Sequence, residues 1–452
     1  MSLISCSNNC VKLFSVVIVF QAIAHLSNAR SVRSTRSSLV FRTERRIEVE
    51  ADKSSQLQFL LEQSARRSRS SYPWDIRAQK TELHSDATKN LTELISENGY
   101  PVEVYTVETA DGFLLDVHRI PHGIASHGSS RGVVFLQHAL LSSACDWVMN
   151  FPNDSLGFIL ADEGFDVWMG NSRGNTYSRR HITLSPNSSK FWDWSVDEMA
   201  EYDMPAFIDF VLNKTGQSSL SLIGHSQGTM MNFALFSQRP DMEKKVRLFI
   251  ALAPVAFVGR IVSPIAYLSL MSDENIYAQF GDKLFLPNDI VVKILVDLFC
   301  TETSIKWICD DILFLFVGND IRNLNQSRLD VYFHHSPAGV SVKDLVHFAQ
   351  LFRMKNFGKY DYGSLAANMA RYNQSTPPQY DISKVKVPVV AFSGIRDWLS
   401  DPADVRQLVN TLPNLKAWYV QPLWNHMDFV WGMTAAQGCY TRIVDWLHAY
   451  NF

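Results

Sequence analysis

Residues 220–228 read LSLIGHSQG, and this stretch decides the fold. The apolar run 220–223 predicts a short buried strand, and the run 229–237 after it predicts a helix. Between them stands a G-x-S-x-G sequence, Gly224-His225-Ser226-Gln227-Gly228. Glycines two residues either side of the serine let strand and helix approach closely at a tight, strained turn, which lifts the hydroxyl above the edge of a sheet. The stretch therefore predicts a nucleophile elbow with Ser226 as the nucleophile.

Apolar runs that predict strands recur on both sides of this elbow. The runs 102–109 and 113–120, joined by Ala110-Asp111-Gly112, predict a hairpin. Further strands are expected at 132–136, 165–169, 246–252, 387–392 and 417–420, and a closing amphipathic helix at 435–450. Because such runs alternate with helical stretches, the sequence predicts an α/β-hydrolase fold, a mostly parallel sheet with helices on both faces.

One long stretch, about 257–380, interrupts this alternation. It is helix-like and rich in Phe, Leu and Ile, and no strand of the sheet is expected within it. We interpret it as a single insertion above the sheet, which predicts a helical cap or lid.

A serine hydroxyl needs an adjacent base, and the base needs an acid that orients it. In an α/β-hydrolase these groups follow the serine in the order acid, then histidine. The strand expected at 387–392 runs into a loop with Asp397, and the strand at 417–420 runs into a loop with His426. Loops at the carboxyl ends of parallel strands are where α/β sheets build their sites. Ser226, Asp397 and His426 are therefore the predicted catalytic residues.

Other acids and histidines near these positions have the right chemistry for the same roles. Asp401 and Asp404 are interpreted as helix caps before Val405, Asp404 with preference. Asp428 adjoins His426 and is assigned to the surface. Core packing is expected for His225, and ordinary structural roles are expected for three histidines of the cap, His334, His335 and His347.

Bulk composition excludes some classes of protein. The chain has 452 residues, of which 46% are hydrophobic and 19% charged, with a formal net charge of -3. This is an ordinary globular composition with no bulk attraction for nucleic acid or anionic membrane. The sequence contains no internal repeat and no metal motif, and no cofactor or metal is expected.

The N-terminal residues predict export. Lys12 precedes the apolar run 13–24, and small residues at 27–29 suit cleavage, so residues 1–29 are interpreted as a signal peptide. An uncleaved signal anchor is the alternative, and no later segment predicts a membrane span. Residues 30–75 are rich in Arg and Ser and are interpreted as a pro-segment or disordered tail, with an arm for nucleic acid or lipid headgroups as the alternative. The hydrolase domain is expected at 76–452.

Cysteines and glycosylation sequons agree with export. Cys300 and Cys309 are close enough in sequence to form a disulfide, whereas Cys145 and Cys439 look unpaired. N-x-[ST] acceptors occur at Asn90, Asn153, Asn187, Asn213, Asn325 and Asn373. The sequence therefore predicts a glycoprotein that is secreted or delivered to the lysosome.

Several stretches resemble the animal acid lipases, the family that includes gastric lipase and lysosomal acid lipase. The likeness covers about residues 91–446 and includes Asn98-Gly99-Tyr100-Pro101, Leu136-Gln137-His138, the run 167–175 (VWMGNSRGN), Lys214-Thr215-Gly216-Gln217, Ser327-Arg328-Leu329-Asp330 and His426-Met427-Asp428-Phe429. Matches of this length are far more specific than G-x-S-x-G alone.

The resemblance implies further roles. It places the triad on Ser226, Asp397 and His426 and the oxyanion hole on the backbone amides of Leu140 and Gln227, where this fold puts its donors. It also implies a disulfide between Cys300 and Cys309 and glycosylation at Asn153, Asn213 and Asn325. It further implies a lid at about 289–316 that opens at a lipid surface, with a pair of core helices as the alternative interpretation of that stretch. The chain departs from the family at Ala139, where glycine is usual, and in its longer N-terminal tail.

The expected activity is a monomeric lipase that hydrolyses carboxylic esters of neutral lipids at a lipid–water interface. The substrate would be triacylglycerol, cholesteryl ester or both. Two alternatives remain, a soluble short-chain carboxylesterase and a catalytically inactive lipid-binding protein on the same scaffold.

Overall fold

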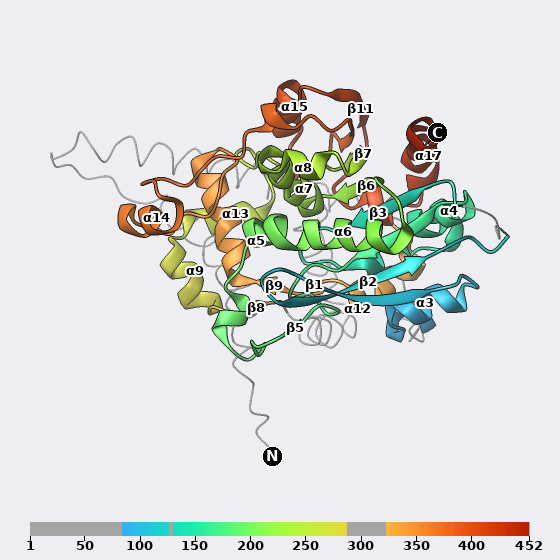
Figure 1. Ribbon diagram of the computed structural model, residues 1–452, viewed down its shortest axis with the longest axis horizontal. Coiled ribbons are helices and arrows are strands. Elements are labelled where there is room, and N and C mark those ends of the chain that lie inside the picture. The colour runs from blue at the N-terminus through green and yellow to red at the C-terminus, as the bar shows by residue number, and fades with distance from the viewer. Residues whose placement is uncertain (1–83, 126–129, 287–321, 452) are drawn as a thin grey trace, which may run out of the picture. The chain divides into compact units, whose positions relative to one another are not determined.

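The computed structural model describes residues 84–125, 130–286 and 322–451 (Figure 1). The chain divides into two units, Met1–Thr81 and Glu82–Phe452, and all described residues belong to the second. The segments interpreted as a signal peptide, a basic tail and a lid at about 289–316 lie outside the described residues, as do Cys300 and Cys309. Within the described ranges, no helix has the length and apolar content needed to cross a bilayer.

A nine-stranded sheet organises the fold, with strand order β1-β2-β4-β3-β6-β7-β10-β11 and with β5 paired to β2. From β4 to β11 every neighbouring pair is parallel, whereas β2 pairs antiparallel with β1, β4 and β5. The strands are β1 (Glu103–Glu108), β2 (Phe113–Ile120), β3 (Val133–Gln137), β4 (Asp166–Gly170), β5 (Arg180–His181), β6 (Leu220–His225), β7 (Val246–Leu252), β10 (Val389–Gly394) and β11 (Leu415–Gln421). The predicted mostly parallel sheet is confirmed.

Every strand expected from the sequence is present, with ends displaced by no more than two residues. The hairpin between β1 and β2 turns at Gly112, whose φ of 91° favours glycine. The closing helix is present in two parts, a π-helical turn followed by an α-helix, and the two-residue strand β5 was not expected.

The helices are short and numerous. The α-helices are α3 (Leu91–Glu97), α4 (Leu156–Asp162), α5 (Val196–Glu198), α6 (Met204–Thr215), α7 (Gln227–Gln238), α8 (Pro240–Glu243), α9 (Asp273–Phe280), α12 (Leu329–His335), α13 (Val342–Met354), α14 (Leu365–Tyr372), α15 (Pro402–Thr411), α16 (Asp428–Trp431) and α17 (Thr441–Asn451). Six 3₁₀ turns are η1 (Ser85–Thr88), η2 (Ala144–Trp147), η3 (Pro152–Asp154), η4 (Ser189–Trp192), η6 (Pro264–Leu270) and η7 (Gln326–Arg328). A further 3₁₀ turn is η8 (Ile382–Lys384), and two π-helical turns are η5 (Met199–Asp203) and η9 (Ala436–Tyr440).

Strand β3 shows how both faces of the sheet are covered. Successive side chains of a strand point to opposite faces. Val133 and Phe135 belong to an apolar core that includes side chains of α6 and α7, and Figure 1 shows these helices lying across that face. Val134 and Leu136 belong to the core on the other face, with α4 and α17. Helices therefore cover both faces, as the sequence predicted.

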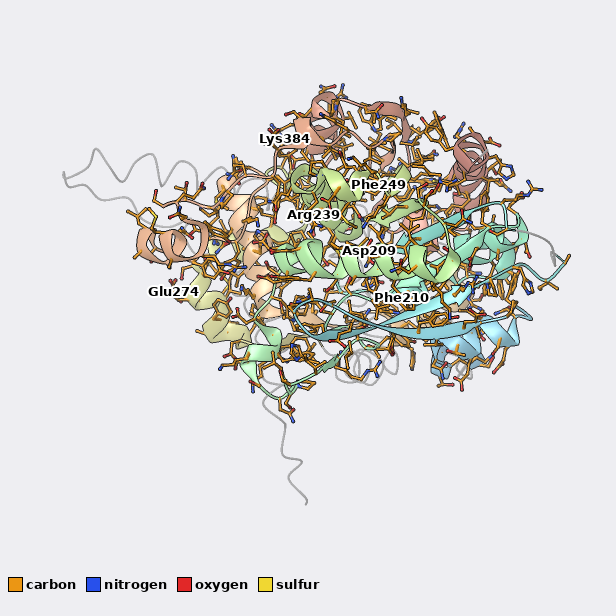
Figure 2. All side chains as sticks on the ribbon, in the orientation of Figure 1. Asp209, Phe210, Arg239, Phe249, Glu274 and Lys384 are labelled. Atoms are coloured by element: carbon orange, nitrogen blue, oxygen red, sulfur yellow. The ribbon has the colours of Figure 1, made fainter. Side chains whose placement is uncertain are left out.

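Aromatic side chains fill the core beneath α7. Phe249 of β7 lies 5.1 Å from the ring of Phe233 and 5.8 Å from that of Phe236, both in edge-to-face geometry. Figure 2 labels Phe249 within this dense packing, whereas the charged Glu274 lies near the edge of the view, by α9. The helix that follows the elbow is thus fixed on the sheet by close aromatic contacts, which adds rigidity to the turn before it.

The stretch between β7 and β10 is an insertion, because its described residues add no strand to the main sheet. It contains η6, α9, α12, α13 and α14, and strands β8 (Leu284–Phe285) and β9 (Val340–Ser341), which pair only with each other. Helix α13 packs against α9 and η6, and Figure 1 shows α9, α13 and α14 gathered at one side of the sheet. The function of this insertion as a cap stays a prediction.

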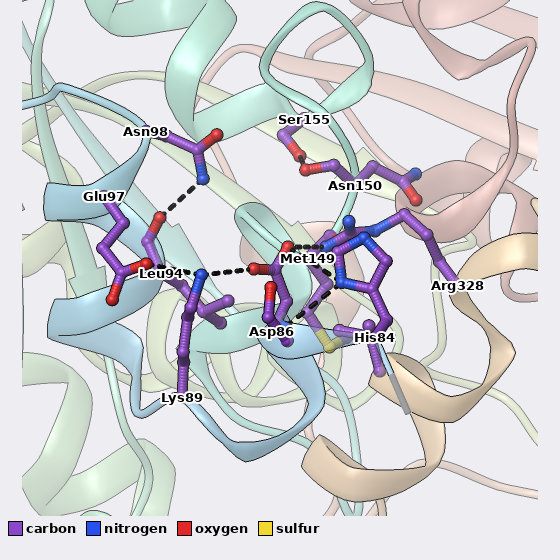
Figure 3. Close-up of polar contacts among 12 residues, drawn as sticks. His84, Asp86, Lys89, Leu94, Glu97, Asn98, Met149, Asn150, Ser155 and Arg328 are labelled. Atoms are coloured by element: carbon purple, nitrogen blue, oxygen red, sulfur yellow. Dashed lines mark hydrogen bonds and ion pairs between the residues drawn. The ribbon is translucent and has the colours of Figure 1, made fainter. Parts of the chain in front are cut away.

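A buried polar cluster joins the segment before α12 to the first described helices (Figure 3). Arg328 donates from Nη2 to Asp86 (2.8 Å) and from Nε to the carbonyl oxygen of Met149 (2.6 Å). Lys89 bonds to the same Asp86 (2.8 Å) and to Glu97 (2.6 Å). Burial raises the pKa of Asp86, but hydrogen bonds from Lys89 and Arg328 outweigh it and leave that pKa below its usual value. The part of the insertion just before α12 is therefore fixed to the N-terminal helices.

Candidate active site

Ser226 occupies the turn between β6 and α7 with φ 52° and ψ −118°, outside the regions that non-glycine residues ordinarily adopt. Such strain persists only where the surroundings enforce it. Two glycines make the crossing of strand and helix possible. A Cβ added to Gly228 would lie 2.4 Å from the carbonyl oxygen of Gln137, and one added to Gly224 would lie 3.0 Å from backbone atoms of Gly228. The strand–turn–helix geometry predicted for the elbow is therefore present.

The structure brings Ser226, Asp397 and His426 together. His426 Nε2 lies 2.7 Å from Ser226 Oγ, and His426 Nδ1 lies 2.8 Å from Asp397 Oδ2. Since a carboxylate can only accept, Nδ1 carries the proton and Nε2 is left to accept the serine hydroxyl hydrogen. All three side chains are buried, with the serine 8% exposed at one end of the chain of hydrogen bonds. This is the geometry of a nucleophile, a base and an orienting acid.

Each of these three hydrogen-bonded residues lies just beyond the carboxyl end of a parallel strand. Ser226 follows β6, Asp397 follows β10 and His426 follows β11, so the sheet brings the three loops to one edge. The loop of Asp397 also holds its carboxylate in place, because the backbone N–H groups of Leu399 (2.9 Å) and Ser400 (2.7 Å) donate to Oδ1. The acid is therefore oriented before it contacts the imidazole.

Of the two acids expected to cap the helix before Val405, Asp401 has that role and Asp404 does not. Asp401, not Asp404, caps α15, because its side chain accepts from the backbone N–H of Ala403 (2.8 Å). Asp404 lies in the first turn of that helix and is paired with Arg260 (2.6 Å). The expectation of a capping role for Asp404 was wrong, since Pro402 occupies the first helical position and moves the cap to the residue before it.

Asp428 is buried and not on the surface, which corrects the second expectation. Its carboxylate accepts from the backbone N–H of Asn425 (2.7 Å), and it begins the short helix α16. This bond closes a turn back to the residue before His426. Asp428 thereby shapes the loop that holds His426.

His225 is buried in the core, as expected, but it also contacts the histidine of the site. Its Nε2 lies 2.9 Å from the carbonyl oxygen of His426, to which it donates, and the two rings are 5.0 Å apart. Burial lowers the pKa of His225 to about 3, so the ring stays neutral. Nothing in the sequence indicates this contact, because it links positions that are distant along the chain.

The histidines of the insertion have the structural roles expected of them. His335 Nε2 lies 3.1 Å from the carbonyl oxygen of Asp86, and His347 Nε2 lies 3.0 Å from that of Gly358. His334 Nδ1 lies 2.8 Å from the carbonyl oxygen of Asp330. Each of the three rings thus lies at hydrogen-bond distance from a backbone carbonyl group.

The backbone N–H groups expected to form an oxyanion hole are those of Gln227 and Leu140. Gln227 is the first residue of α7, where an N–H group has no acceptor within its own helix. Leu140 lines the same cavity as Ser226 and His426. Neither N–H makes a hydrogen bond to any described residue. Ala139 does not adopt a positive φ, so the departure from glycine at this position introduces no left-handed strain.

A largely apolar cavity opens beside the serine. It is formed by loops of the sheet and by the inserted stretch, and its apolar lining includes Leu140, Leu141, Ile265, Leu268, Phe348, Phe352, Leu399 and Trp431. A cavity of this kind offers acyl chains a water-poor environment in contact with the nucleophile.

Two buried side chains beside the predicted oxyanion hole were missed in the sequence. Asp344 of α13 accepts a hydrogen bond from the side-chain amide of Gln227, and burial raises its pKa to about 7. His138 lies between β3 and Leu140 and makes hydrogen bonds from both sides of its ring. The sequence contains a signal for His138, which ends the Leu136-Gln137-His138 stretch just before Leu140. It contains none for Asp344, because Asp344 is more than a hundred residues from Gln227.

The described residues also locate the predicted sequons and free thiols. Asn90, Asn153, Asn187, Asn213 and Asn373 are exposed, and Asn325 is half-buried, so each of the six lies at least partly at the surface. Cys145 and Cys439 are buried and unpaired, as expected.

A mostly parallel sheet, an elbow serine and a histidine–carboxylate pair at the carboxyl edge define the class as an α/β-hydrolase. Comparison with known families agrees, because the family described as "alpha/beta hydrolase fold" matches residues 132–433 and that described as "Partial alpha/beta-hydrolase lipase region" matches residues 91–151. A solved structure of a putative lipase from Sulfolobus solfataricus shares the fold, with a TM-score of 0.54, 14% identity and coverage of 77% of this chain and 94% of that one.

Curated relatives define the family more closely. The chain is 47% identical to lysosomal acid lipase/cholesteryl ester hydrolase of Homo sapiens, over 82% of this chain and 94% of that protein. It is 46% identical to gastric triacylglycerol lipase of Homo sapiens, over 79% of this chain and 91% of that protein. The chain belongs to the acid lipase family of α/β-hydrolases.

Proposed function

We propose that this protein hydrolyses carboxylic esters of neutral lipids through an acyl-enzyme formed on Ser226. The observation that carries the proposal is the position of His426, which lies 2.7 Å from the serine hydroxyl and 2.8 Å from the Asp397 carboxylate. A serine in this arrangement becomes a nucleophile because its proton can move to the imidazole as it attacks.

The reaction follows from this geometry in two halves. Ser226 Oγ attacks the ester carbonyl carbon while His426 Nε2 takes the hydroxyl proton, and Asp397 stabilises the imidazolium. The backbone N–H groups of Leu140 and Gln227 donate to the developing oxyanion. The intermediate collapses, His426 gives its proton to the departing alcohol, and the acyl group remains on the serine. Water then attacks the acyl-enzyme by the same steps, and the fatty acid leaves.

The apolar cavity and the relatives favour a lipid substrate over a small soluble ester. The transfer of acyl chains from water to an apolar surface of this kind is favourable. Lysosomal acid lipase is named for acid lipase and cholesteryl ester hydrolase activity, and gastric lipase for triacylglycerol. We therefore propose triacylglycerol or cholesteryl ester as substrate, presented at a lipid–water interface to a monomeric enzyme.

The relatives also favour a protein of the secretory pathway. Lysosomal and gastric lipases are both named for compartments reached by that route. Cleavage after residue 29, glycosylation at some of the six sequons and a Cys300–Cys309 disulfide are part of this proposal. Intact-mass analysis of the secreted protein, before and after deglycosylation and reduction, measures all three.

Replacement of the nucleophile tests the proposed mechanism. Ser226→Ala is expected to lower kcat on emulsified trioleoylglycerol by at least about 10³-fold, while the protein folds normally. Ser237→Ala, a buried serine at the far end of α7, is the matched control and is expected to retain turnover. The wild type, but not Ser226→Ala, should be labelled by a fluorophosphonate probe. Full activity in Ser226→Ala would refute the assignment.

The same preparations separate the alternative functions. A soluble carboxylesterase would hydrolyse dissolved p-nitrophenyl butyrate faster than trioleoylglycerol or cholesteryl oleate emulsions, whereas the proposed lipase turns over the emulsions faster. An inactive lipid-binding protein would show neither turnover nor fluorophosphonate labelling. Either of these results would overturn the proposed lipase activity.

A further inference from the structure

His138 directly follows β3 and precedes the loop that carries Leu140, and its side chain is only 3% exposed. Its ring is bonded on both sides. Nδ1 lies 2.8 Å from the carbonyl oxygen of Ala139, while Nε2 lies 3.0 Å from the backbone nitrogen of Ser172 and 3.2 Å from Nδ2 of Asn175. The described partners therefore account for both nitrogens of the ring.

These partners allow one tautomer only. A carbonyl oxygen can only accept, so Nδ1 must carry the hydrogen that it donates to Ala139. A backbone N–H can only donate, so Nε2 must be the unprotonated nitrogen that accepts from Ser172. The two sides of the ring lead independently to the same protonation, with Nδ1 as donor and Nε2 as acceptor. The Nδ1–H group of His138 is thus a fixed hydrogen-bond donor to the Ala139 carbonyl, in the loop before Leu140.

The bond to Ala139 has a consequence at the next residue. The carbonyl group of Ala139 and the N–H group of Leu140 belong to one planar trans peptide unit, in which the two groups point in opposite directions. Whatever fixes the carbonyl therefore also fixes the N–H. We propose that His138 is a positioning residue of the oxyanion hole, which orients the Leu140 N–H by holding the opposite end of its peptide. The inference rests on the proposed function, which gives that N–H its role.

Other contacts of the loop do not replace this one. The Ala139 carbonyl also accepts from the N–H of Ser142, but that bond is 3.3 Å long, near the limit of a hydrogen bond, whereas the bond from His138 is 2.8 Å. Leu141, with φ 60°, is held separately, because its carbonyl accepts from Ala338 N–H (2.6 Å). The turn sets the path of the loop, and the histidine holds the peptide plane within it.

The ring also stays in the required tautomer above about pH 4. Burial lowers the pKa of His138 to about 4, so the imidazole is neutral above that pH. A second proton would stand on Nε2 and face the N–H of Ser172, where two donors would oppose each other. An oxyanion donor must be positioned before the reaction, since its effect depends on needing no rearrangement in the transition state.

Two substitutions separate the two sides of the ring. The amide nitrogen of asparagine stands close to the place of Nδ1, so His138→Asn keeps a donor for Ala139 and loses the acceptor for Ser172. The carbonyl oxygen of glutamine reaches the place of Nε2, so His138→Gln keeps the acceptor and loses the donor. A purely structural histidine would tolerate glutamine better, because glutamine satisfies the buried N–H of Ser172.

Each variant, as the full chain, is assayed on dissolved p-nitrophenyl butyrate for kcat and KM, with Tm as a measure of folding. Phosphonylation of Ser226 by a p-nitrophenyl alkylphosphonate gives a second rate that needs the oxyanion hole. His138→Gln is expected to lower kcat and the phosphonylation rate by about 10- to 100-fold with little change in KM. His138→Asn is expected to restore turnover to within about threefold of the wild type, at a Tm lower by about 2–8 °C.

The reverse order would overturn the proposal. If His138→Gln is as active as the wild type, or if both variants lose kcat in proportion to their loss of Tm, the histidine acts only through stability. Ser226→Ala, assayed beside them, distinguishes the two levels of inference. If that variant stays active, the proposed nucleophile is wrong. If it is inactive while His138→Gln is fully active, only the role of His138 fails.

Discussion

Gly228→Ala is the perturbation whose effect can be worked out most directly from the structure. An alanine Cβ at this position would lie 2.4 Å from the carbonyl oxygen of Gln137 and 2.8 Å from that of His138. Contacts shorter than 3.0 Å to backbone atoms are not tolerated, so α7 and the end of β3 must separate by roughly 0.6 Å or more. That separation occurs between the nucleophile turn and the loop of Leu140.

The expected size follows from this displacement. Overpacking of a close backbone contact costs about 1–3 kcal/mol of stability. Activity should fall further than stability implies, because a displacement of about 1 Å within a catalytic arrangement lowers turnover by about 10²-fold. We therefore expect a folded Gly228→Ala protein whose kcat on p-nitrophenyl butyrate is lower by about 10- to 100-fold.

Gly216→Ala provides the matched control. Gly216 has φ 69° and no atom within 4 Å of an added Cβ, so alanine there introduces backbone strain without a steric clash, at the end of α6 and remote from the serine. Its stability should fall by about 1 kcal/mol with kcat unchanged. Kinetics at 25 °C and urea unfolding of both variants give the comparison. Equal kcat values in the two variants, at comparable losses of stability, would refute the steric reasoning.

Two further predictions concern buried carboxylates. Asp397→Asn should lower kcat by about 10⁴-fold with a small change in stability, because the amide no longer favours the tautomer with Nδ1 protonated; a loss of less than about tenfold in steady-state kinetics would contradict the assignment. Burial raises the pKa of Asp344 to about 7 from an ordinary value of 3.8. Between these two pH values the native protein keeps a proton on Asp344 that the unfolded chain has released. The free energy of unfolding should therefore fall as pH rises through that window, by up to about 4 kcal/mol. Asp344→Asn removes this term, so its Tm should fall less than that of the wild type between pH 5 and pH 7; parallel Tm curves would show that Asp344 is not the titrating group.

The sheet was predictable because each of its central strands is buried on both faces. Continuous apolar runs such as 246–252 and 387–392 can be recognised without knowledge of their partners, and the turn at Gly112 identified the hairpin. The order of the strands was not predictable from such runs, since it depends on the packing of the connecting helices. The strand β5 pairs over two residues only and carries no apolar pattern.

The site was predictable where chemistry limits the residue types. A nucleophile, a base and an acid must be Ser226, a histidine and a carboxylate in a known order, and their loops follow strands that the sequence reveals. The residues that hold this group in place were not predictable in the same way. Asp344 and His225 act through contacts with distant parts of the chain, and many buried polar residues are compatible with such positions. The burial of Asp428 has the same origin, because it follows from the shape of its loop.

The bond from His225 to the carbonyl oxygen of His426 has a consequence for thermal inactivation. The loop of His426 follows β11, which is an edge strand of the sheet and is only half-buried. Segments with few buried contacts open at a lower free-energy cost than core strands do. Here His225, the neighbour of the nucleophile, bonds to the backbone of His426 across 201 residues of sequence. This bond helps to fix the distance between Ser226 and His426 independently of β11. On heating, we therefore expect β11 to open before turnover is lost. Turnover should be lost only at the temperature at which the central strands of the sheet unfold.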